Sequence, residues 1–252
     1  MKHESIGIVM AMQEEIRPVL RRLGRHRKEQ AGRFPLYLFQ RDGRQLFLIE
    51  SGMGTKRASA ATEELIARAQ PRMIITAGLG GAIRPGLNVG EVVLAGHVLT
   101  LDEGITTKIT AIANDELLRA VHKSLPGQPF RIVDGTTVTT GGIVNKRLAD
   151  QQLAREIVNP VLDMETSAVA GITGRNGIPL IAVRAISDAA EEELLFSLDE
   201  LSDRELNIRI GKVLSTIAKR PRILPQLIRL AKNSKLAANN LAIILEQLTH
   251  LV

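Results

Sequence analysis

Three acidic residues, each coming shortly after an apolar run, are the first candidates for chemistry: Glu15, Glu165 and Asp188. In open α/β sheets ligands bind beyond the carboxyl ends of the strands, so acids that follow strands are expected to gather at one edge. Clustered carboxylates without His partners suit acid–base chemistry, because burial and neighbouring negative charge raise their pKa values toward neutrality. Taken singly, each acid is better interpreted as a helix cap. Three at one edge favour chemistry.

Two glycine-rich segments, Ser51–Thr55 and Gly78–Gly81, lie near the same expected edge. Their backbone N–H groups are suited to hold an anion or a ribose. Neither segment matches G-x-G-x-x-G or a P-loop, so turn formation is the alternative for most of these glycines. His97 and His122 have no motif around them and are interpreted as structural or exposed.

The elements that must position these residues alternate between buried apolar runs and helical patterns. Strands are expected at Ile6–Met12, Leu36–Gln40, Gln45–Glu50, Arg72–Ala77, Glu91–Leu101, Phe130–Thr140 and Pro179–Ile186. Helices are expected at Gln13–Leu23, from Ser51–Thr55 to about Ala69, at Asp115–Ser124 and from Thr166. This alternation predicts an α/β domain with a largely parallel or mixed sheet.

Composition excludes several classes of protein. The 252 residues are 44% apolar, which suffices for one sizeable core or two small ones. Aromatic residues make up only 2%, which argues against nucleic-acid binding by base stacking. There is no Cys and there are only five His, so disulfides, Cys-ligated zinc and a metal site are not expected. No apolar run reaches the ~18 residues of a membrane span and no signal peptide is recognised, so we expect a cytoplasmic protein.

The net charge of +6 is concentrated in the C-terminal segment. Residues 207–252 contain eight Lys or Arg and one acid, which gives +7, whereas the first 206 residues sum to −1. Pro221 and Pro225 are expected to divide this segment into at least two helices. An apolar face at helical spacing is expected to pack on the domain, with membrane-surface or partner binding as alternatives: Leu241, Ile244, Leu245, Leu248 and Leu251.

Six motifs in this order and spacing resemble the nucleoside phosphorylase superfamily, and most closely its 5′-methylthioadenosine/S-adenosylhomocysteine nucleosidases: Ile6–Ile16, Ser51–Gly54, Ala77–Ala82, Asn88–Val93, Asp163–Ala168 and Arg184–Asp188. The resemblance covers about residues 5–203. It implies a three-layer α/β/α sandwich around a mixed, partly barrel-like sheet, with a catalytic domain at 1–206, a basic helical extension at 207–252 and a homodimer.

The resemblance also implies that the chain is an enzyme that cleaves the N-glycosidic bond of a purine nucleoside through a ribosyl cation-like transition state. A leaving purine must take a proton at N7, and Asp188 beside Ser187 matches the acid that gives it. Glu165 matches the ribose-binding acid, and Met164 matches an apolar contact of the substrate. Glu15 falls at the position of the carboxylate that activates the attacking water.

The sequence departs from the family's pattern around the substrate. After Gly78, nucleosidases typically have Ser where this chain has Leu79, and their aromatic contacts are replaced by aliphatic residues at about Val144 and Leu198. Phosphorylases have Arg where Thr76 stands, so water is expected as nucleophile and no cofactor is expected. Inorganic phosphate is the alternative, held by an arginine elsewhere: Arg17, Arg57 or Arg84.

The C-terminal segment resembles the ending of the hopanoid-associated members of the superfamily, through Lys219–Arg229 and Ser234–Leu248. That resemblance implies removal of adenine from an adenosyl-lipid, with the basic segment at the inner membrane face. A different class of function is a non-catalytic nucleoside sensor or a nucleic-acid-associated protein that acts through this segment. The three carboxylates and the lack of aromatic residues argue against it. We expect a hydrolytic nucleosidase that releases adenine.

Overall fold

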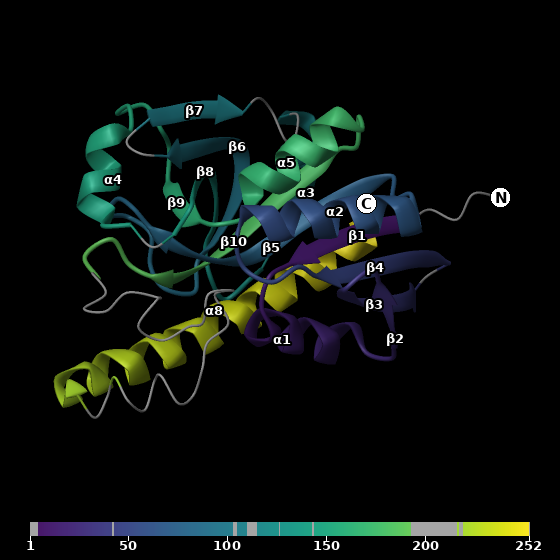
Figure 1. Ribbon diagram of the computed structural model, residues 1–252, viewed down its shortest axis with the longest axis horizontal. Helices are drawn as coiled ribbons and strands as arrows, with labels where there is room; N and C mark the ends of the chain where they lie inside the picture. Colours follow the sequence, from purple (N-terminus) through teal and green to yellow (C-terminus); the bar gives the residue numbers. More distant parts are fainter. Residues whose placement is uncertain are drawn as a thin grey trace.

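The computed structural model describes residues 5–41, 43–102, 105–109, 115–125, 127–142, 144–192, 216 and 219–251. Strands and helices alternate along these ranges (Figure 1). The strands are β1 (Ser5–Met10), β2 (Arg27–Ala31), β3 (Phe34–Arg41), β4 (Arg44–Glu50), β5 (Met73–Ala82), β6 (Val92–Asp102), β7 (Ile105–Ile109), β8 (Ile132–Thr140), β9 (Pro160–Asp163) and β10 (Leu180–Asp188). The helices are α1 (Gln13–Leu23), α2 (Thr55–Ala69), α3 (Asp115–Ser124), α4 (Lys146–Gln152), α5 (Thr166–Arg175), the short 3₁₀ helix η1 (Pro221–Ile223) and α8 (Leu224–Leu251).

The ten strands form one mixed sheet in the order β10-β6-β8-β9-β5-β1-β4-β3-β2, with β7 paired to β6. β1 runs parallel to β4 and β5, and β5 runs parallel to β10. Because β10 pairs with β6 as well as with β5, the strands β10, β6, β8, β9 and β5 close into a ring. The expected mixed, partly barrel-like sheet is therefore confirmed.

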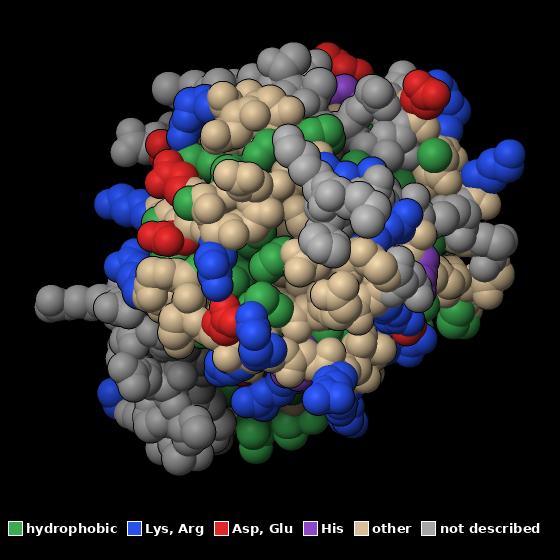
Figure 2. Space-filling model, turned by 90° about the vertical axis from the view of Figure 1, so that its right-hand side faces the viewer, with side chains coloured by type: hydrophobic (Ala, Val, Ile, Leu, Met, Phe, Trp, Pro, Cys, Tyr) green, Lys and Arg blue, Asp and Glu red, His purple; other side chains and the backbone are tan. Residues whose placement is uncertain are grey.

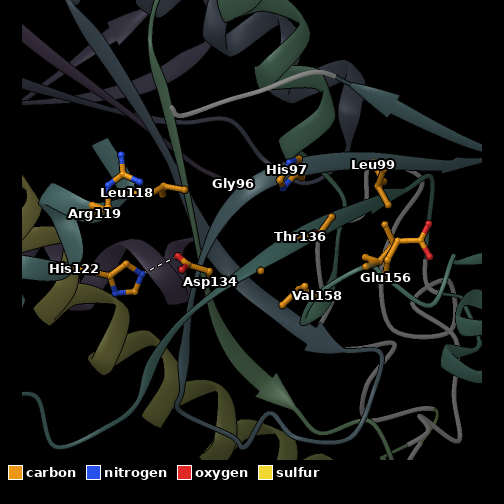
Figure 3. A pocket seen from close by; sticks show the side chains of 12 residues that line it. Gly96, His97, Leu99, Leu118, Arg119, His122, Asp134, Thr136, Glu156 and Val158 are labelled. Atoms are coloured by element: carbon orange, nitrogen blue, oxygen red, sulfur yellow. Dashed lines mark hydrogen bonds and ion pairs between the residues drawn. The ribbon is translucent and has the colours of Figure 1, made fainter. Parts of the chain in front are cut away.

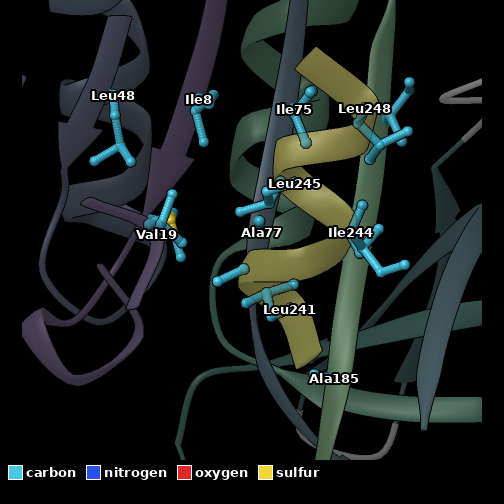
Figure 4. Close-up of a cluster of buried hydrophobic side chains, with 14 of the residues drawn as sticks. Ile8, Val19, Leu48, Ile75, Ala77, Ala185, Leu241, Ile244, Leu245 and Leu248 are labelled. Atoms are coloured by element: carbon cyan, nitrogen blue, oxygen red, sulfur yellow. The ribbon is translucent and has the colours of Figure 1, made fainter. Parts of the chain in front are cut away.

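Helices cover both faces of the sheet (Figure 1). One apolar cluster joins α1, α3 and α8 to the sheet, and Figure 4 shows Val19 and Leu245 from its helices close to Ile8 and Ile75 from its strands. A second cluster joins α2 and α5 to the other face through residues such as Leu65 and Val169. The three-layer α/β/α sandwich is confirmed.

The described part of the C-terminal extension ends in one long helix, α8. Pro225 is the second residue of α8, where a missing backbone N–H costs little, so the division of the segment falls at Pro221 and not at Pro225. Pro221 begins the separate turn η1. Four residues of the expected apolar face are fully buried against the sheet: Leu241, Ile244, Leu245 and Leu248 (Figure 4). The boundary predicted at residues 206 and 207 lies outside the described residues.

Three strands and one α-helix were not expected from the sequence. β2 has the sequence RKEQA, whose charged side chains give no apolar pattern because it is an edge strand that pairs only with β3 along the described sheet. β7, the four-residue β9 and α4 were also missed. The segment Gly78–Gly81, expected as a loop, instead continues β5, because β10 pairs with it along its whole length.

The surface shows no extended apolar face where it can be seen. On the side drawn in Figure 2, hydrophobic side chains form separate areas among backbone and charged groups. Among the described residues, no helix combines the length and the apolar character needed to cross a bilayer.

Candidate active site

The glycine-rich end of β5 is the backbone at which two of the three predicted acids are placed. The amide of Leu79 donates a hydrogen bond to Oε1 of Glu15 (2.8 Å). On the neighbouring strand β10, Asp188 is in register with Gly81, and the Ser187 hydroxyl donates to the carbonyl of Gly80 (3.3 Å). The structure thus brings Glu15 and Asp188 to the same short segment of β5.

Glu15 lies in the first turn of α1 and is almost completely buried. Its second carboxylate oxygen, Oε2, accepts a hydrogen bond from the amide of Met12 (3.1 Å), so Glu15 also caps its own helix. Burial raises the pKa of Glu15, and the amide of Leu79 and the charge of Arg184 partly oppose this shift. A raised pKa makes this carboxylate a stronger base than an exposed glutamate.

Glu165 lies immediately before α5 and accepts a hydrogen bond at Oε1 from the amide of Gly54 (2.8 Å). The segment Ser51–Thr55 therefore gives one of its backbone N–H groups to an acid of the site. Burial raises the pKa of Glu165 to about 7, helped by the negative charges of Asp163 and Glu15 and opposed by Arg184.

Asp188 is the last residue of β10, just after an irregularity in the pairing of this strand with β5. Its Oδ1 accepts a hydrogen bond from the Ser187 hydroxyl (2.6 Å), which is the hydroxyl neighbour expected from the sequence. Its Oδ2 lies 2.5 Å from Nζ of Lys146, a residue of α4 that sequence reasoning did not single out.

A buried ion pair joins Arg184 of β10 to Asp163 of β9. Arg184 is 1% exposed and donates from Nη2 and Nε to Oδ2 of Asp163 at 2.7 and 3.1 Å. Asp163 also accepts from the hydroxyl of Thr139 (2.6 Å) and from the amide of Thr166 (2.9 Å). Thr166 is the first residue of α5, so Asp163 links the start of this helix to the ion pair. A charged residue within the apolar strand β10 was the signal that would have indicated Arg184, since a buried charge needs a partner.

For the other residues predicted to contact the substrate, the structure gives fewer contacts with the acids. A Cβ on Gly78 would come within 3.0 Å of Oε1 of Glu15, so glycine is required there for the carboxylate to approach. Leu79 packs against the core cluster of α1 and α8, and Val144 packs against the small cluster around Val138. Met164 is partly exposed beside Glu165. Leu198 lies outside the described residues.

The arginines considered for phosphate have other surroundings. The guanidinium of Arg84 donates hydrogen bonds to Asp150 and to backbone carbonyls of the 153–157 segment. These bonds hold the segment in place and use the donors that a phosphate would need. Arg17 is exposed on α1, and Arg57 lies against Gly52. In this structure neither Arg84 nor Arg17 contributes to the cluster of acids.

A cavity of about 480 Å³ lies elsewhere, between β6, β8 and α3 (Figure 3). Its lining includes His97, Leu118 and the pair formed by His122 Nε2 and Asp134 Oδ1 (2.7 Å). Thr136, which also lines it, pairs with the first residue of β9, whereas the acids gather near the last residue of that strand. The cavity and the acids are therefore at opposite ends of β8 and β9. Across the part of the chain that is described, no three His, Asp or Glu side chains are grouped as a metal site.

Comparisons with known proteins agree with the geometry. The family model described as the phosphorylase superfamily matches residues 5–219. The fold is shared with a 5′-methylthioadenosine/S-adenosylhomocysteine nucleosidase of Helicobacter pylori (TM-score 0.75, 16% identity, covering 100% of both chains). It is also shared with a futalosine hydrolase of Helicobacter pylori (0.75, 17%, 99% of this chain and 98% of that one) and an S-adenosylhomocysteine nucleosidase of Streptococcus pyogenes (0.75, 21%, 100% and 99%). The chain belongs to the phosphorylase superfamily of enzymes.

Proposed function

We propose that this enzyme uses water to cleave the N-glycosidic bond of an adenosine-type nucleoside and releases adenine. The observation that carries the proposal is that Glu15 and Asp188 meet at the glycine-rich end of β5, while Glu165 is held by the second glycine-rich segment at Gly54. The raised pKa values of Glu15 and Glu165 suit groups that take part in proton transfer. The structural relatives include nucleosidases, which supports the same chemistry.

Each acid takes one part of the reaction. Asp188 delivers a proton to N7 of the purine while the bond between C1′ and N9 breaks and its electron pair leaves with the base. The carboxylate of Glu165 stabilises the cationic sugar and binds its hydroxyl groups. Glu15 accepts a proton from the water whose oxygen forms the new bond to C1′. Met164, Leu79 and Val144 contribute apolar contacts to the substrate.

Water is favoured over phosphate because the two cations described in contact with the site residues are both paired with carboxylates. Arg184 is held by Asp163 and by the hydroxyl of Thr166, and Lys146 is held by Asp188. Thr76 on β5 is a neutral residue that also contacts Arg184 (3.4 Å). A phosphate would have to compete with Asp163 and Asp188 for these positive charges.

Product analysis with and without phosphate tests this proposal. Purified enzyme is incubated with adenosine, 5′-methylthioadenosine and S-adenosylhomocysteine, and the released base and sugar are quantified. We expect adenine and a free reducing sugar from at least one nucleoside, at a rate that does not depend on phosphate. A sugar 1-phosphate, formed only when phosphate is added, would contradict hydrolysis. No base release from any nucleoside would contradict the function itself.

A second candidate is removal of adenine from an adenosyl-lipid at an anionic membrane surface. The face buried against the sheet is not available for membrane contact, but the first half of α8 exposes Leu224 and Ile228, which are 41% and 49% exposed. Lys232 and Lys235 continue this face at helical spacing and are exposed, as is Arg222 in η1. Apolar groups beside cations suit the interface of an anionic bilayer.

Co-sedimentation with vesicles tests this second candidate. The triple variant Arg222→Gln/Lys232→Gln/Lys235→Gln is compared with a control triple variant on α1 and α2: Arg17→Gln/Arg21→Gln/Lys56→Gln. We expect the first to lose binding to vesicles that contain phosphatidylglycerol and the control to keep it. Equal binding by both would contradict a membrane role for α8. Substitution is preferred to deletion because α8 supplies part of the core.

We further propose a cytoplasmic homodimer, as the resemblance to the nucleosidases implies. The proposal concerns the native assembly of the full chain. Light scattering coupled to size-exclusion chromatography is expected to give twice the mass of one chain, and the mass of a single chain at micromolar concentration would contradict it.

A further inference from the structure

Lys146 has an unusual position for a lysine. It is the first residue of α4, and its side chain is 8% exposed. Its ammonium group lies 2.5 Å from Oδ2 of Asp188 and donates a hydrogen bond to the carbonyl of Ala189 (2.5 Å). A longer contact of 3.4 Å runs to the carbonyl of Asp188 itself. The polar partners of the ammonium therefore all lie at the end of β10.

Helix energetics alone do not account for this lysine. The N-terminus of a helix carries partial positive charge, so a cation there is disfavoured and an acid would be preferred. Burial of an ammonium group adds a desolvation cost that only a close partner offsets. Asp188 is that partner, which means that the two charges depend on each other in the folded protein.

The backbone of β5 leaves room for the pair. A Cβ on Gly81 would lie 2.6 Å from Oδ2 of Asp188 and 3.3 Å from Cε of Lys146. Glycine at this position thus allows the carboxylate and the ammonium to meet over the strand. The other group that faces the Asp188 carboxylate is the Ser187 hydroxyl, from its own strand.

The ion pair between Lys146 and Asp188 determines which of the two residues carries the proton before the reaction. An aspartate that is paired with an ammonium group rests as a carboxylate, and a carboxylate has no proton to give to a purine. The ammonium group of Lys146 does have one, in direct contact with the residue proposed to act on N7. We propose that Lys146 supplies, through Asp188, the proton that the departing base takes up. This inference rests on the function proposed above.

As the bond from C1′ to N9 breaks, its electron pair passes to the purine and makes N7 more basic. A proton leaves Nζ of Lys146 for the Asp188 carboxylate, and Asp188 passes a proton to N7, so that Lys146 becomes a neutral amine and Asp188 is again a carboxylate. After the base leaves, Glu15 releases to the solvent the proton it took from the attacking water, and the amine of Lys146 takes up one proton from the solvent, so that both groups return to their starting states. Lys146 acts through Asp188 and does not touch the substrate, so it is a positioning residue.

The test uses three variants of the full chain and the rate of adenine release across pH. Lys146→Met removes the ammonium group. Lys146→Arg keeps a positive charge that cannot release its proton at these pH values. Arg147→Met, at the next and exposed position, is the matched control. Each rate is divided by the wild-type rate at the same pH, so that the titrations of Glu15 and Glu165 cancel.

We expect kcat of both Lys146 variants to fall about 100-fold near pH 7.5 with little change in KM, and R147M to match the wild type. The K146M ratio should rise as pH falls, because Asp188 then takes its proton from the solvent. Recovery of the wild-type rate by K146R would overturn the inference, since charge without a releasable proton would then suffice. A K146M ratio that does not vary with pH would overturn it as well.

The outcomes separate this inference from the function on which it rests. A wild-type chain that releases no base contradicts the proposed function. A wild-type chain that is active, with Lys146 variants that keep its rate, contradicts only the role of Lys146. Circular dichroism and thermal unfolding of each variant establish that it is folded, and K146R remains informative if K146M does not fold.

Discussion

At the scale of single residues, the site holds more negative than positive charge. Glu15, Glu165 and Asp163 surround Arg184, and the pKa values of both glutamates are raised by burial. Arg184 donates hydrogen bonds from Nη2 and Nε to Asp163. Its positive charge is therefore balanced mainly by Asp163 and only partly offsets the negative charges of the two glutamates. Burial thus leaves both glutamates with a raised affinity for protons.

The free energy of unfolding should depend on pH through the titration of Glu165. A carboxyl group whose pKa is raised on folding from 4.5 to about 7 stabilises the fold below pH 4.5, and this contribution is lost as pH rises through 7. Glu165→Gln, which keeps an acceptor for the amide of Gly54, is expected to match the wild type near pH 5. Near pH 8 it should be more stable by about 2 kcal/mol.

Urea unfolding of E165Q and the wild type at the two pH values measures this difference. Glu63→Gln, at an exposed site on α2, is the control and should follow the wild type at both. A constant difference between E165Q and the wild type at pH 5 and pH 8 would show that Glu165 does not titrate in this range.

The candidate acids could be predicted from the sequence because each follows an apolar run that ends at the same edge of the sheet. Lys146 and Arg184 could not be assigned in this way. Lys146 reaches Asp188 only because α4 folds over the end of β10, which no local pattern encodes. Arg184 was visible as a charge inside an apolar strand, but the sequence does not say that Asp163 neutralises it.

At the scale of elements, β5 shows why glycines recur beside the acids. β9 and β10 both pair with its final residues, and a Cβ on Gly80 would overlap Cγ1 of Val161 and lie 3.0 Å from the carbonyl of Leu162. The periodic apolar pattern predicted the strand as far as Ala77. Its glycine-rich continuation was taken for a loop, because glycines carry no side chains to show a pattern.

Substitution at Gly80 should be costly and partly reversible. Gly80→Ala is expected to reduce the free energy of unfolding by about 1–3 kcal/mol, because the added methyl group meets Val161 within a packed sheet. Val161→Ala in the same chain makes room for it, so the double variant should lose less than the sum of the two single variants. Urea unfolding of all four proteins forms the cycle. Strict additivity would mean that Val161 is not the group that excludes a side chain at Gly80.

At the scale of the whole molecule, the C-terminal helix completes the fold. α8 packs beside α1 on one face of the sheet, and its apolar face joins residues that lie more than 200 positions earlier in the sequence, such as Ile8 (Figure 4). Helical periodicity predicted which face of α8 is apolar. The same periodicity led to the expectation that this face packs on the domain, but which strands it meets depends on the long-range order of the sheet.

Truncation of a single side chain of α8 should therefore affect the whole protein. Leu245→Ala removes a fully buried side chain and is expected to cost about 2–5 kcal/mol of unfolding free energy. Leu236→Ala, on the same helix and 49% exposed, is the matched control and should cost clearly less. Thermal and urea unfolding measure both. An L245A variant as stable as the wild type would contradict the packing of α8 into the core.

The activity of Asp188→Asn tests the central claim most directly. The amide is nearly the same size as the carboxyl group but cannot pass a proton from Lys146 to the base. Asp134→Asn, at an exposed aspartate beside the separate cavity, is the control. The measurement is adenine release by the three folded proteins under identical conditions. We predict loss of at least about 100-fold in D188N and unchanged activity in D134N. Adenine release by D188N at the wild-type rate would contradict the account.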